Sequence, residues 1–147
     1  MRVRTRQAAL CIFRRGHTFL VAQVTDPHTG HVYQRPPGGG LEPNESPEAA
    51  VTREIQEELG ITLTDSQPIG PIDHIWLWKG YEVHERAWLF LADSSEHPSL
   101  NNGQTPEILE PDGDRFRTYW RAIRDDNASL PPICPSTLLE FLRPHLT

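Results

Sequence analysis

Residues 38–61 read GGGLEPNESPEAAVTREIQEELGI, a glycine run followed by an acidic and partly apolar segment. The segment predicts a helix over 47–59. Ser46 is a typical N-cap residue, and Pro47 suits the first helical turn, where no amide proton is needed. Gly60 would end the helix, because glycine readily adopts the left-handed conformation of a C-cap. The predicted order is therefore a glycine-rich loop, one helix and a stop.

The predicted helix carries an apolar stripe and, beside it, a group of carboxylates. Val51, Ile55 and Leu59 recur every four residues and would pack against a sheet. At about 100° per residue, three carboxylates fall within one arc of about 100°: Glu54, Glu57 and Glu58.

Like charges at helical spacing repel one another, so the three carboxylates need an explanation. An exposed, solvated helix face is the ordinary one. A divalent cation is the alternative, because Mg²⁺ and Mn²⁺ prefer carboxylate and water ligands and keep waters that a phosphate can replace. The adjacent glycines would let a ligand approach the backbone closely. The residues alone thus leave open a solvated face or an acidic metal site suited to a diphosphate.

The rest of the chain predicts antiparallel hairpins and a second helix. Turn residues separate the apolar runs at Arg15-Gly16-His17 and at Lys79-Gly80, and residues 93–114 are polar and loop-like. A second helix is expected over 136–143. The expected strands are 5–13, 18–24, 31–35, 73–78, 81–92 and 115–123. Hairpins with two helices indicate an α/β fold, in which helices cover a mixed sheet.

Composition limits the classes of protein. A chain of 147 residues has the size of one domain, so we expect a single domain over 1–147. No apolar run approaches the roughly 20 residues of a membrane span, so we expect a cytoplasmic protein with no membrane partner. The net charge of −6 disfavours binding to a nucleic acid polymer, and it would repel a phosphorylated small molecule unless cations intervene. Cys11 and Cys134 share no CxxC motif and are expected to be reduced thiols.

The spacing of the glycines and charged residues across 39–61 resembles the Nudix box of the Nudix (MutT-like) hydrolase family. The positions that carry the resemblance are Gly39, Glu45, Arg53-Glu54, Glu57-Glu58 and Gly60-Ile61. The resemblance implies an α/β/α sandwich with a mixed sheet. It also implies metal-dependent hydrolysis of a nucleoside diphosphate linked to another moiety, with Mg²⁺ or Mn²⁺ as cofactor and water attacking phosphorus.

The resemblance implies roles for residues of the box. Glu57 and Glu58 would be metal ligands, and Glu54 would be a metal ligand or the general base. Arg53 would orient Glu54 through a salt bridge, and the carbonyl of Gly38 could also reach a metal ion. Of the remaining positions, Glu42 would join the outer shell of the site, Glu45 would fix the loop and Gly60 would end the helix.

Family members often use one more acid from outside the box. Glu85, in the segment EVHERAWLF, is the strand candidate and would be a further metal ligand, although a solvent-facing carboxylate is an equal alternative. The loop offers four more acids, each of which could be a plain surface charge: Glu107, Glu110, Asp112 and Asp114.

The lead-in DPHTGHVYQRPPGGG resembles that of a bacterial Nudix group, DPxxGxxxxRPxGGG, which has no single assigned substrate. Arg35 would contact phosphate, and Gly39 and Gly40 would line the substrate site. Tyr33 or Trp120 could stack on a base, although an aromatic residue in a strand more often belongs to the core.

Three functions remain in competition. The leading prediction is a pyrophosphohydrolase whose partner is a small nucleotide diphosphate derivative, in a chain that could form a homodimer. A Nudix-fold module that senses a nucleotide without cleaving it is the alternative, although such modules usually have degenerate boxes. An isomerase acting on a prenyl diphosphate would need a cysteine in a recognisable motif, and neither cysteine lies in one.

Overall fold

The computed structural model describes residues 1–110, 112–124 and 129–146. In these ranges the helices are α1 (Pro47–Leu59) and α2 (Leu138–Leu142), and single 3-10 turns lie at η1 (Ser94–Glu96), η2 (Pro98–Leu100) and η3 (Arg143–His145). The strands are β1 (Arg2–Arg15), β2 (Thr18–Thr25), β3 (Val32–Arg35), β4 (Gly38–Gly40), β5 (Gln67–Pro68), β6 (Ile72–Trp78), β7 (Tyr81–Asp93), β8 (Glu107–Leu109) and β9 (Arg115–Ala122).

Strand β1 is the centre of the sheet. The strand order among the described residues is β5-β7-β1-β2-β9-β8, with β3 beside β2, β4 beside β1 and β6 beside β7. β1 pairs in parallel with β7 over its whole length, from Arg2 opposite Tyr81 to Arg14 opposite Asp93, whereas its pairing with β4 is antiparallel. The sheet is therefore mixed, as predicted.

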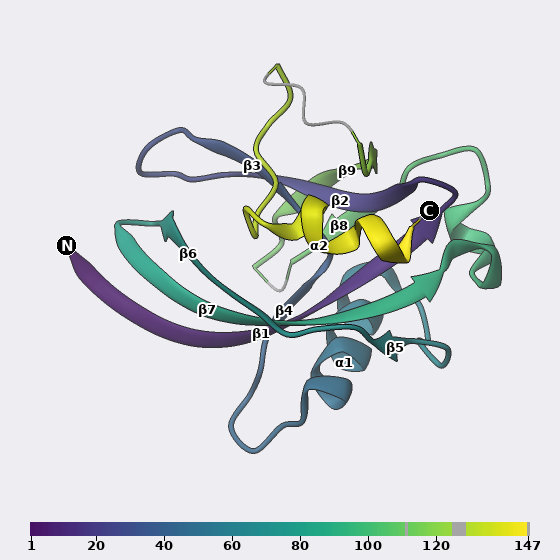
Figure 1. Ribbon diagram of the computed structural model, residues 1–147, viewed down its shortest axis with the longest axis horizontal. Coiled ribbons are helices and arrows are strands. Elements are labelled where there is room, and N and C mark those ends of the chain that lie inside the picture. The colour runs from purple at the N-terminus through teal and green to yellow at the C-terminus, as the bar shows by residue number, and fades with distance from the viewer. Residues whose placement is uncertain (111, 125–128, 147) are drawn as a thin grey trace.

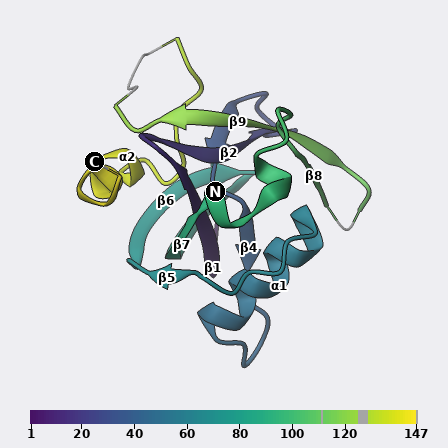
Figure 2. The same cartoon turned by 90° about the vertical axis from the view of Figure 1, so that its right-hand side faces the viewer.

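The buried run of β1 explains the layering of the fold. Residues 8–13 are fully buried, because both faces of the sheet are covered there. Alternate side chains point to opposite faces: Cys11 packs in the core under α1, and Ile12 packs in the core under α2. Figure 1 shows α1 and α2 on opposite sides of the β1 and β7 ribbons, and Figure 2 shows the same separation from the side. The predicted α/β/α sandwich is confirmed.

Local signals define α1 as the sequence predicts. The Ser46 hydroxyl oxygen accepts a hydrogen bond from the Ala49 N–H at 3.1 Å, and Pro47 occupies the first turn. Gly60 adopts φ 67° and ψ 21°, and its N–H donates to the carbonyl of Gln56. Val51 and Ile55 are buried against the sheet. The apolar stripe thus anchors the helix and leaves its acidic edge beside the glycine strand β4.

Several parts differ from the expected elements. The glycine run is not a loop but the strand β4, which pairs with β1, and β5 was not among the expected strands. The segment 93–114 is not a plain loop, because η1, η2 and β8 form within it, and β8 pairs with β9. β1 begins at Arg2 rather than at residue 5, since its polar first half pairs with β7. The second helix is shorter than 136–143 and continues into η3. No helix in the described ranges combines the length and the apolar composition needed to cross a bilayer.

Candidate active site

Two glycines of strand β4 leave no room for a side chain, one because of β1 and the other because of α1. Gly38 has φ 141°, and a Cβ atom added there would lie 2.1 Å from the carbonyl oxygen of Ala9. A Cβ atom at Gly39 would lie 2.6–2.7 Å from the carboxylate atoms of Glu54. The first glycine therefore permits the strand pairing, and the second permits the helix carboxylate to rest on the strand.

Arg53 holds the acidic edge of α1 in place. Its Nε and Nη2 atoms donate to the two carboxylate oxygens of Glu45, both at 2.8 Å. Nη1 donates to Glu54 Oε1 at 2.9 Å, and Nη2 also donates to the carbonyl of Gly40 at 3.1 Å. The Arg53–Glu54 salt bridge that the box implies is therefore present, and the same guanidinium ties the helix to the glycine strand and to the loop before it.

Glu45 fixes the loop between β4 and α1. The Glu42 N–H donates to Glu45 Oε1 at 2.9 Å, while Arg53 binds both oxygens of the same carboxylate. The hydrogen bonds from Arg53, followed by the backbone hydrogen bond of Glu42, lower the pKa of Glu45 to about 2. Glu42 itself lies 3.7 Å from Arg53 Nε, at the outer side of this cluster.

Glu58 and Glu110 form the most buried acidic pair. Glu58 Oε1 accepts the N–H of Gly38 at 2.8 Å, so the helix reaches the start of the glycine strand. Burial first, and then the charges of Glu110 and Glu54, raise the pKa of Glu58 to about 9. Burial also raises the pKa of Glu110 and of Glu54. Three carboxylates thus share one region with too little positive charge to keep them all ionised.

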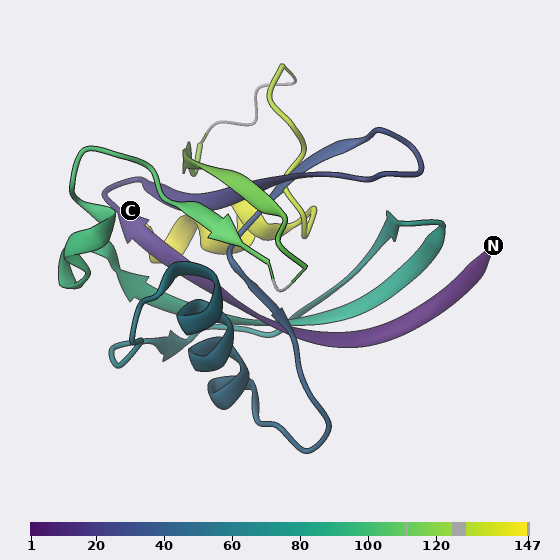
Figure 3. The same cartoon turned by 180° about the vertical axis from the view of Figure 1, so that it is seen from behind.

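Glu110 is a site residue that sequence reasoning did not single out among four loop acids. It follows β8, which packs next to α1, and Figure 3 shows this strand beside the helix. A turn holds the residue, because its N–H donates to the carbonyl of Asp114 and its carbonyl accepts the N–H of Gly113. The available signal was its place in the loop before a late strand, but choosing Glu110 over Glu107 required the register of β8 with β9.

Glu57 is placed less centrally than the box implies. Its side chain is 46% exposed, and Oε2 lies 3.5 Å from Arg53 Nη1. Among the residues that the structure describes, no three His, Cys, Asp or Glu side chains already form a closed ligand set for a metal ion. The helix carboxylates therefore divide into an inner pair, Glu54 and Glu58, and an outer one, Glu57.

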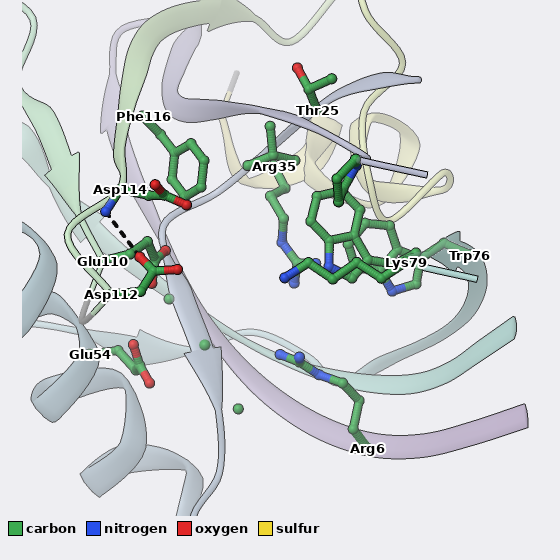
Figure 4. A pocket seen from close by; sticks show the side chains of 16 residues that line it. Arg6, Thr25, Arg35, Glu54, Trp76, Lys79, Glu110, Asp112, Asp114 and Phe116 are labelled. Carbon is green, nitrogen blue, oxygen red and sulfur yellow. Dashed lines mark hydrogen bonds between the residues drawn. The ribbon is translucent and has the colours of Figure 1, made fainter. Parts of the chain in front are cut away.

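A pocket of about 570 Å³ opens beside these carboxylates. Figure 4 shows that its charges are separated: Glu54, Glu110, Asp112 and Asp114 lie on one side, and Arg6, Arg35 and Lys79 lie on the other. The three glycines of β4 also line the pocket, with Gly39 against Glu54 and Gly40 nearest to Arg6. The predicted site residues Gly38, Gly39, Gly40, Arg35 and Glu54 are thus brought together around one cavity.

Glu85 is not placed with the helix carboxylates. Its side chain is fully buried, and its oxygens lie 2.7 Å from Arg6 Nε, 3.3 Å from Arg35 Nη2 and 2.7 Å from His74 Nε2. Burial alone would raise its pKa, but Arg35, His74 and Arg6 outweigh burial and lower the pKa to about 2. The structure therefore places Glu85 as the counter-ion of two arginines, because cationic and imidazole groups occupy the oxygens that a metal ion would need.

The two aromatic residues predicted to stack on a base, Tyr33 and Trp120, lie in different places. Trp76 lines the pocket, Arg35 lies over its ring at 4.8 Å, and Tyr33 contacts it edge-on. Trp120 instead stacks under Arg15 and lines a different depression beside β9. Of the two predicted stacking residues, Tyr33 contacts a residue of the pocket wall, whereas Trp120 lies at a different depression. Trp76 itself, on β6, belongs to the pocket wall.

The donor set suits a hard divalent cation. Glu54, Glu58 and Glu110 offer only oxygen atoms, which Mg²⁺ and Mn²⁺ prefer. Burial raises the pKa of all three carboxyl groups, and the charges of Glu110 and Glu54 raise that of Glu58 further, so a bound cation would favour their ionised forms. The cavity beside them leaves room for water and phosphate oxygens to complete the coordination.

Comparisons with known proteins identify relatives that are named as pyrophosphohydrolases or diphosphatases. The RNA pyrophosphohydrolase of Vibrio atlanticus is 33% identical over 103 residues, covering 60% of this chain and 58% of that protein. The 8-oxo-dGTP diphosphatase of Proteus vulgaris is 36% identical over 61 residues, covering 42% of this chain and 54% of that protein. The chain therefore spans less than two thirds of the length of these curated relatives.

A solved structure and a family profile cover nearly the whole chain. The crystal structure of the MutT Nudix hydrolase from Burkholderia pseudomallei is 26% identical, with a TM-score of 0.60, and the match covers 95% of this chain and 98% of that one. The family profile described as NUDIX domain matches residues 4–128. With the glycine strand, the Arg53 cluster and the sandwich in place, the chain belongs to the Nudix family.

Proposed function

We propose that this chain is a metal-dependent pyrophosphohydrolase that cleaves the diphosphate linkage of a nucleoside diphosphate derivative. The observation that carries the proposal is the convergence of Glu54, Glu58 and Glu110 beside the glycine strand, where Glu54 and Glu110 line one side of a pocket whose other side is cationic. Nudix hydrolases generally need divalent metal ions. The all-oxygen donor set supports Mg²⁺ or Mn²⁺ here.

Glu58 and Glu110 would hold the cations, and Glu57 would join from the outer side by a change of rotamer. The carbonyl of Gly38 borders the same cavity and remains a candidate ligand. The bound ions would neutralise the diphosphate and lower the pKa of the attacking water. The binding energy of this chain toward diphosphate would thus depend on the ions at its acidic side.

Glu54 is the residue we propose as general base. Its Oε1 atom accepts a hydrogen bond from Arg53, so Oε2 is the atom left to take a proton from water. Burial raises its pKa above the usual range of a glutamate, which brings its basicity closer to that needed near neutral pH. Arg53 acts as a positioning residue, because it fixes Glu54 against the glycine strand.

Gly39, Gly40 and Arg35 are proposed to bind substrate. The glycines have no side chains to keep a phosphate from the backbone, and Arg35 presents a guanidinium to the same cavity. Glu85 is proposed as a positioning residue for Arg6 and Arg35 rather than as a metal ligand, since it is buried between them.

The proposal is tested by phosphate and nucleotide release from a panel of nucleoside triphosphates, dinucleoside polyphosphates and sugar nucleotides, with Mg²⁺ or Mn²⁺. Glu54→Gln should lower kcat by roughly 10²–10⁴-fold with little change in KM, because general base catalysis contributes about that much. Glu48→Gln is the matched control, since it removes an exposed carboxylate from the first turn of the same helix. Equal kcat values for the two variants would contradict the proposal.

A 5′-triphosphorylated RNA oligonucleotide belongs in the same panel. The Vibrio atlanticus relative is named RNA pyrophosphohydrolase, so an RNA end is the second candidate substrate. The net charge of −6 favours a small nucleotide instead. A higher kcat/KM on the RNA than on the matching mononucleotide at physiological salt would reverse that preference.

A further inference from the structure

The cationic side of the pocket lies apart from the proposed metal ligands and the proposed general base. It consists of Arg6 on β1, Arg35 on β3 and Lys79 in the β6–β7 turn, here called the cationic cluster. Figure 4 shows these three side chains on the side of the cavity opposite Glu54 and Glu110.

The two arginines of the cationic cluster share one contacting carboxylate among the described residues. Glu85 lies 2.7 Å from Arg6 and 3.3 Å from Arg35, while Asp26 accepts the backbone N–H of Lys79 at 3.3 Å. Glu54 acts on Arg6, and Glu58 acts on Arg35, through space. An arginine is always protonated in a protein, so the two guanidinium groups exceed the charge of Glu85 by one, and Lys79 lines the same wall. This surplus attracts an anion.

The surplus charge is costly because it is partly removed from water. The Arg35 side chain is 12% exposed and lies over the Trp76 ring at 4.8 Å, so its orientation is fixed. Burial lowers the pKa of Arg6, and although Glu85 opposes this, the charge of Arg35 lowers it further. Two like charges held together at partial burial are stabilised when a dianionic group binds them, and planar guanidinium groups match phosphate oxygens in pairs.

The position of the cluster relative to the glycines defines which phosphate it could bind. A Cβ atom at Gly40 would lie 3.7 Å from Arg6 Nη2, so the last glycine borders the cationic cluster while Gly39 borders Glu54. A ligand that crosses the glycine strand would therefore place one phosphate group near the carboxylates and another near the arginines.

We propose that the cationic cluster binds a phosphate group beyond the diphosphate that is cleaved, so that the preferred substrates carry at least three phosphate groups. That such compounds are substrates rests on the proposed hydrolase function, whereas the binding of the anion does not. The extra phosphate could extend the same polyphosphate chain, or it could be esterified to the 3′-oxygen of the nucleoside. The two sources present the same dianionic chemistry to the arginines.

Binding without metal tests the cluster separately from catalysis. Inorganic tripolyphosphate is titrated by calorimetry in EDTA into the full chain and into Arg6→Gln, Lys79→Asn and Arg86→Gln. Asparagine tolerates the positive φ of 51° at position 79. Arg86 is the matched control, because it points to the opposite face of β7 and pairs with exposed Asp73. We expect Arg6→Gln to weaken binding roughly tenfold and Arg86→Gln to leave it unchanged. Undetectable binding, or equal affinity for all four proteins, would overturn the inference.

Turnover then separates the two sources of phosphate. The ratio of kcat/KM for diadenosine tetraphosphate to that for ADP-ribose reports a longer chain, and the ratio for adenosine 3′-phosphate 5′-diphosphate to ADP reports a 3′-phosphate. A preference of roughly tenfold or more in one ratio, lost in Arg6→Gln, supports the inference and names the source. A loss of equal size on every substrate, ADP-ribose included, would contradict it, because Arg6 would then serve the cleaved diphosphate itself. If no compound is hydrolysed, the proposed function fails, and the calorimetry still decides the anion site.

Discussion

At the scale of single residues, neighbouring glycines of the run have different roles: Gly38 permits strand pairing, and Gly39 permits the Glu54 side chain to approach the strand. Gly38 meets backbone, since an added Cβ atom would lie 2.1 Å from the carbonyl oxygen of Ala9, and its φ of 141° is itself unfavourable for other residues. Gly39 meets the end of the Glu54 side chain. A carboxylate can turn away from an added methyl group, whereas a paired strand cannot.

Alanine should therefore mainly reduce stability at position 38 and mainly reduce activity at position 39. Gly38→Ala should lower the free energy of unfolding by about 3 kcal/mol, because the strained backbone and the clash have no local relief. Gly39→Ala should lower it by less than about 1 kcal/mol, yet reduce kcat by roughly tenfold or more, because Glu54 loses its position. Urea unfolding and steady-state kinetics on the same preparations measure both. A stable but inactive Gly38→Ala together with an unfolded Gly39→Ala would contradict this assignment.

At the scale of elements, what could be predicted depended on how far apart in sequence the interacting residues lie. Helix α1 was predicted with its bounds, because Ser46, Pro47 and Gly60 act within a few residues of one another. The parallel pairing of β1 with β7 was not predicted, since it joins segments about 80 residues apart, and the polar start of β1 gives no apolar pattern. The surroundings of Glu110 and Glu85 could not be predicted for the same reason, because they depend on strand register rather than on local spacing.

The caps of α1 give a prediction at this scale. Ser46→Ala removes the acceptor for the Ala49 N–H and should lower the free energy of unfolding by about 1 kcal/mol. Gly60→Ala forces a β-carbon into the left-handed conformation at φ 67° and should cost about the same. The two sites lie at opposite ends of the helix, so the double variant should show the sum of the two losses in urea unfolding. A double variant no less stable than either single one would show that the caps act on the same step of unfolding.

At the scale of the whole molecule, the fold sorts its charges into separate places although the net charge is only −6. Glu54 and Glu110 lie on one side of the pocket, and the cationic cluster lies on the other (Figure 4). Composition predicted the need for cations beside a phosphorylated ligand, but it could not locate two arginines on one buried carboxylate. That arrangement requires β1, β3 and β7 to meet, which only the folded sheet brings about.

The acidic side should make the metal-free protein less stable as the pH rises. Burial, Glu110 and Glu54 raise the pKa of Glu58 from 4.5 to about 9, so between these values the folded chain keeps a proton that the unfolded chain releases. An acid with a raised pKa stabilises the fold fully only below its unfolded value, and that contribution is lost between about pH 4.5 and pH 9.

Glu58→Gln should remove this loss, because the amide oxygen can still accept the Gly38 N–H while no charge forms. In EDTA at pH 8 we expect the variant to exceed the wild-type chain in free energy of unfolding by ~1 kcal/mol or more, and to match it near pH 4. Adding Mg²⁺ should stabilise the wild-type chain more than the variant, because the ion offsets the repulsion that the variant lacks. Urea unfolding from pH 4 to pH 9, with Glu48→Gln as the surface control, measures each of these differences. A Glu58→Gln protein that is less stable than wild type at pH 8 would show that the carboxylate is already compensated by the fold, and the acidic side would then have no need of a cation.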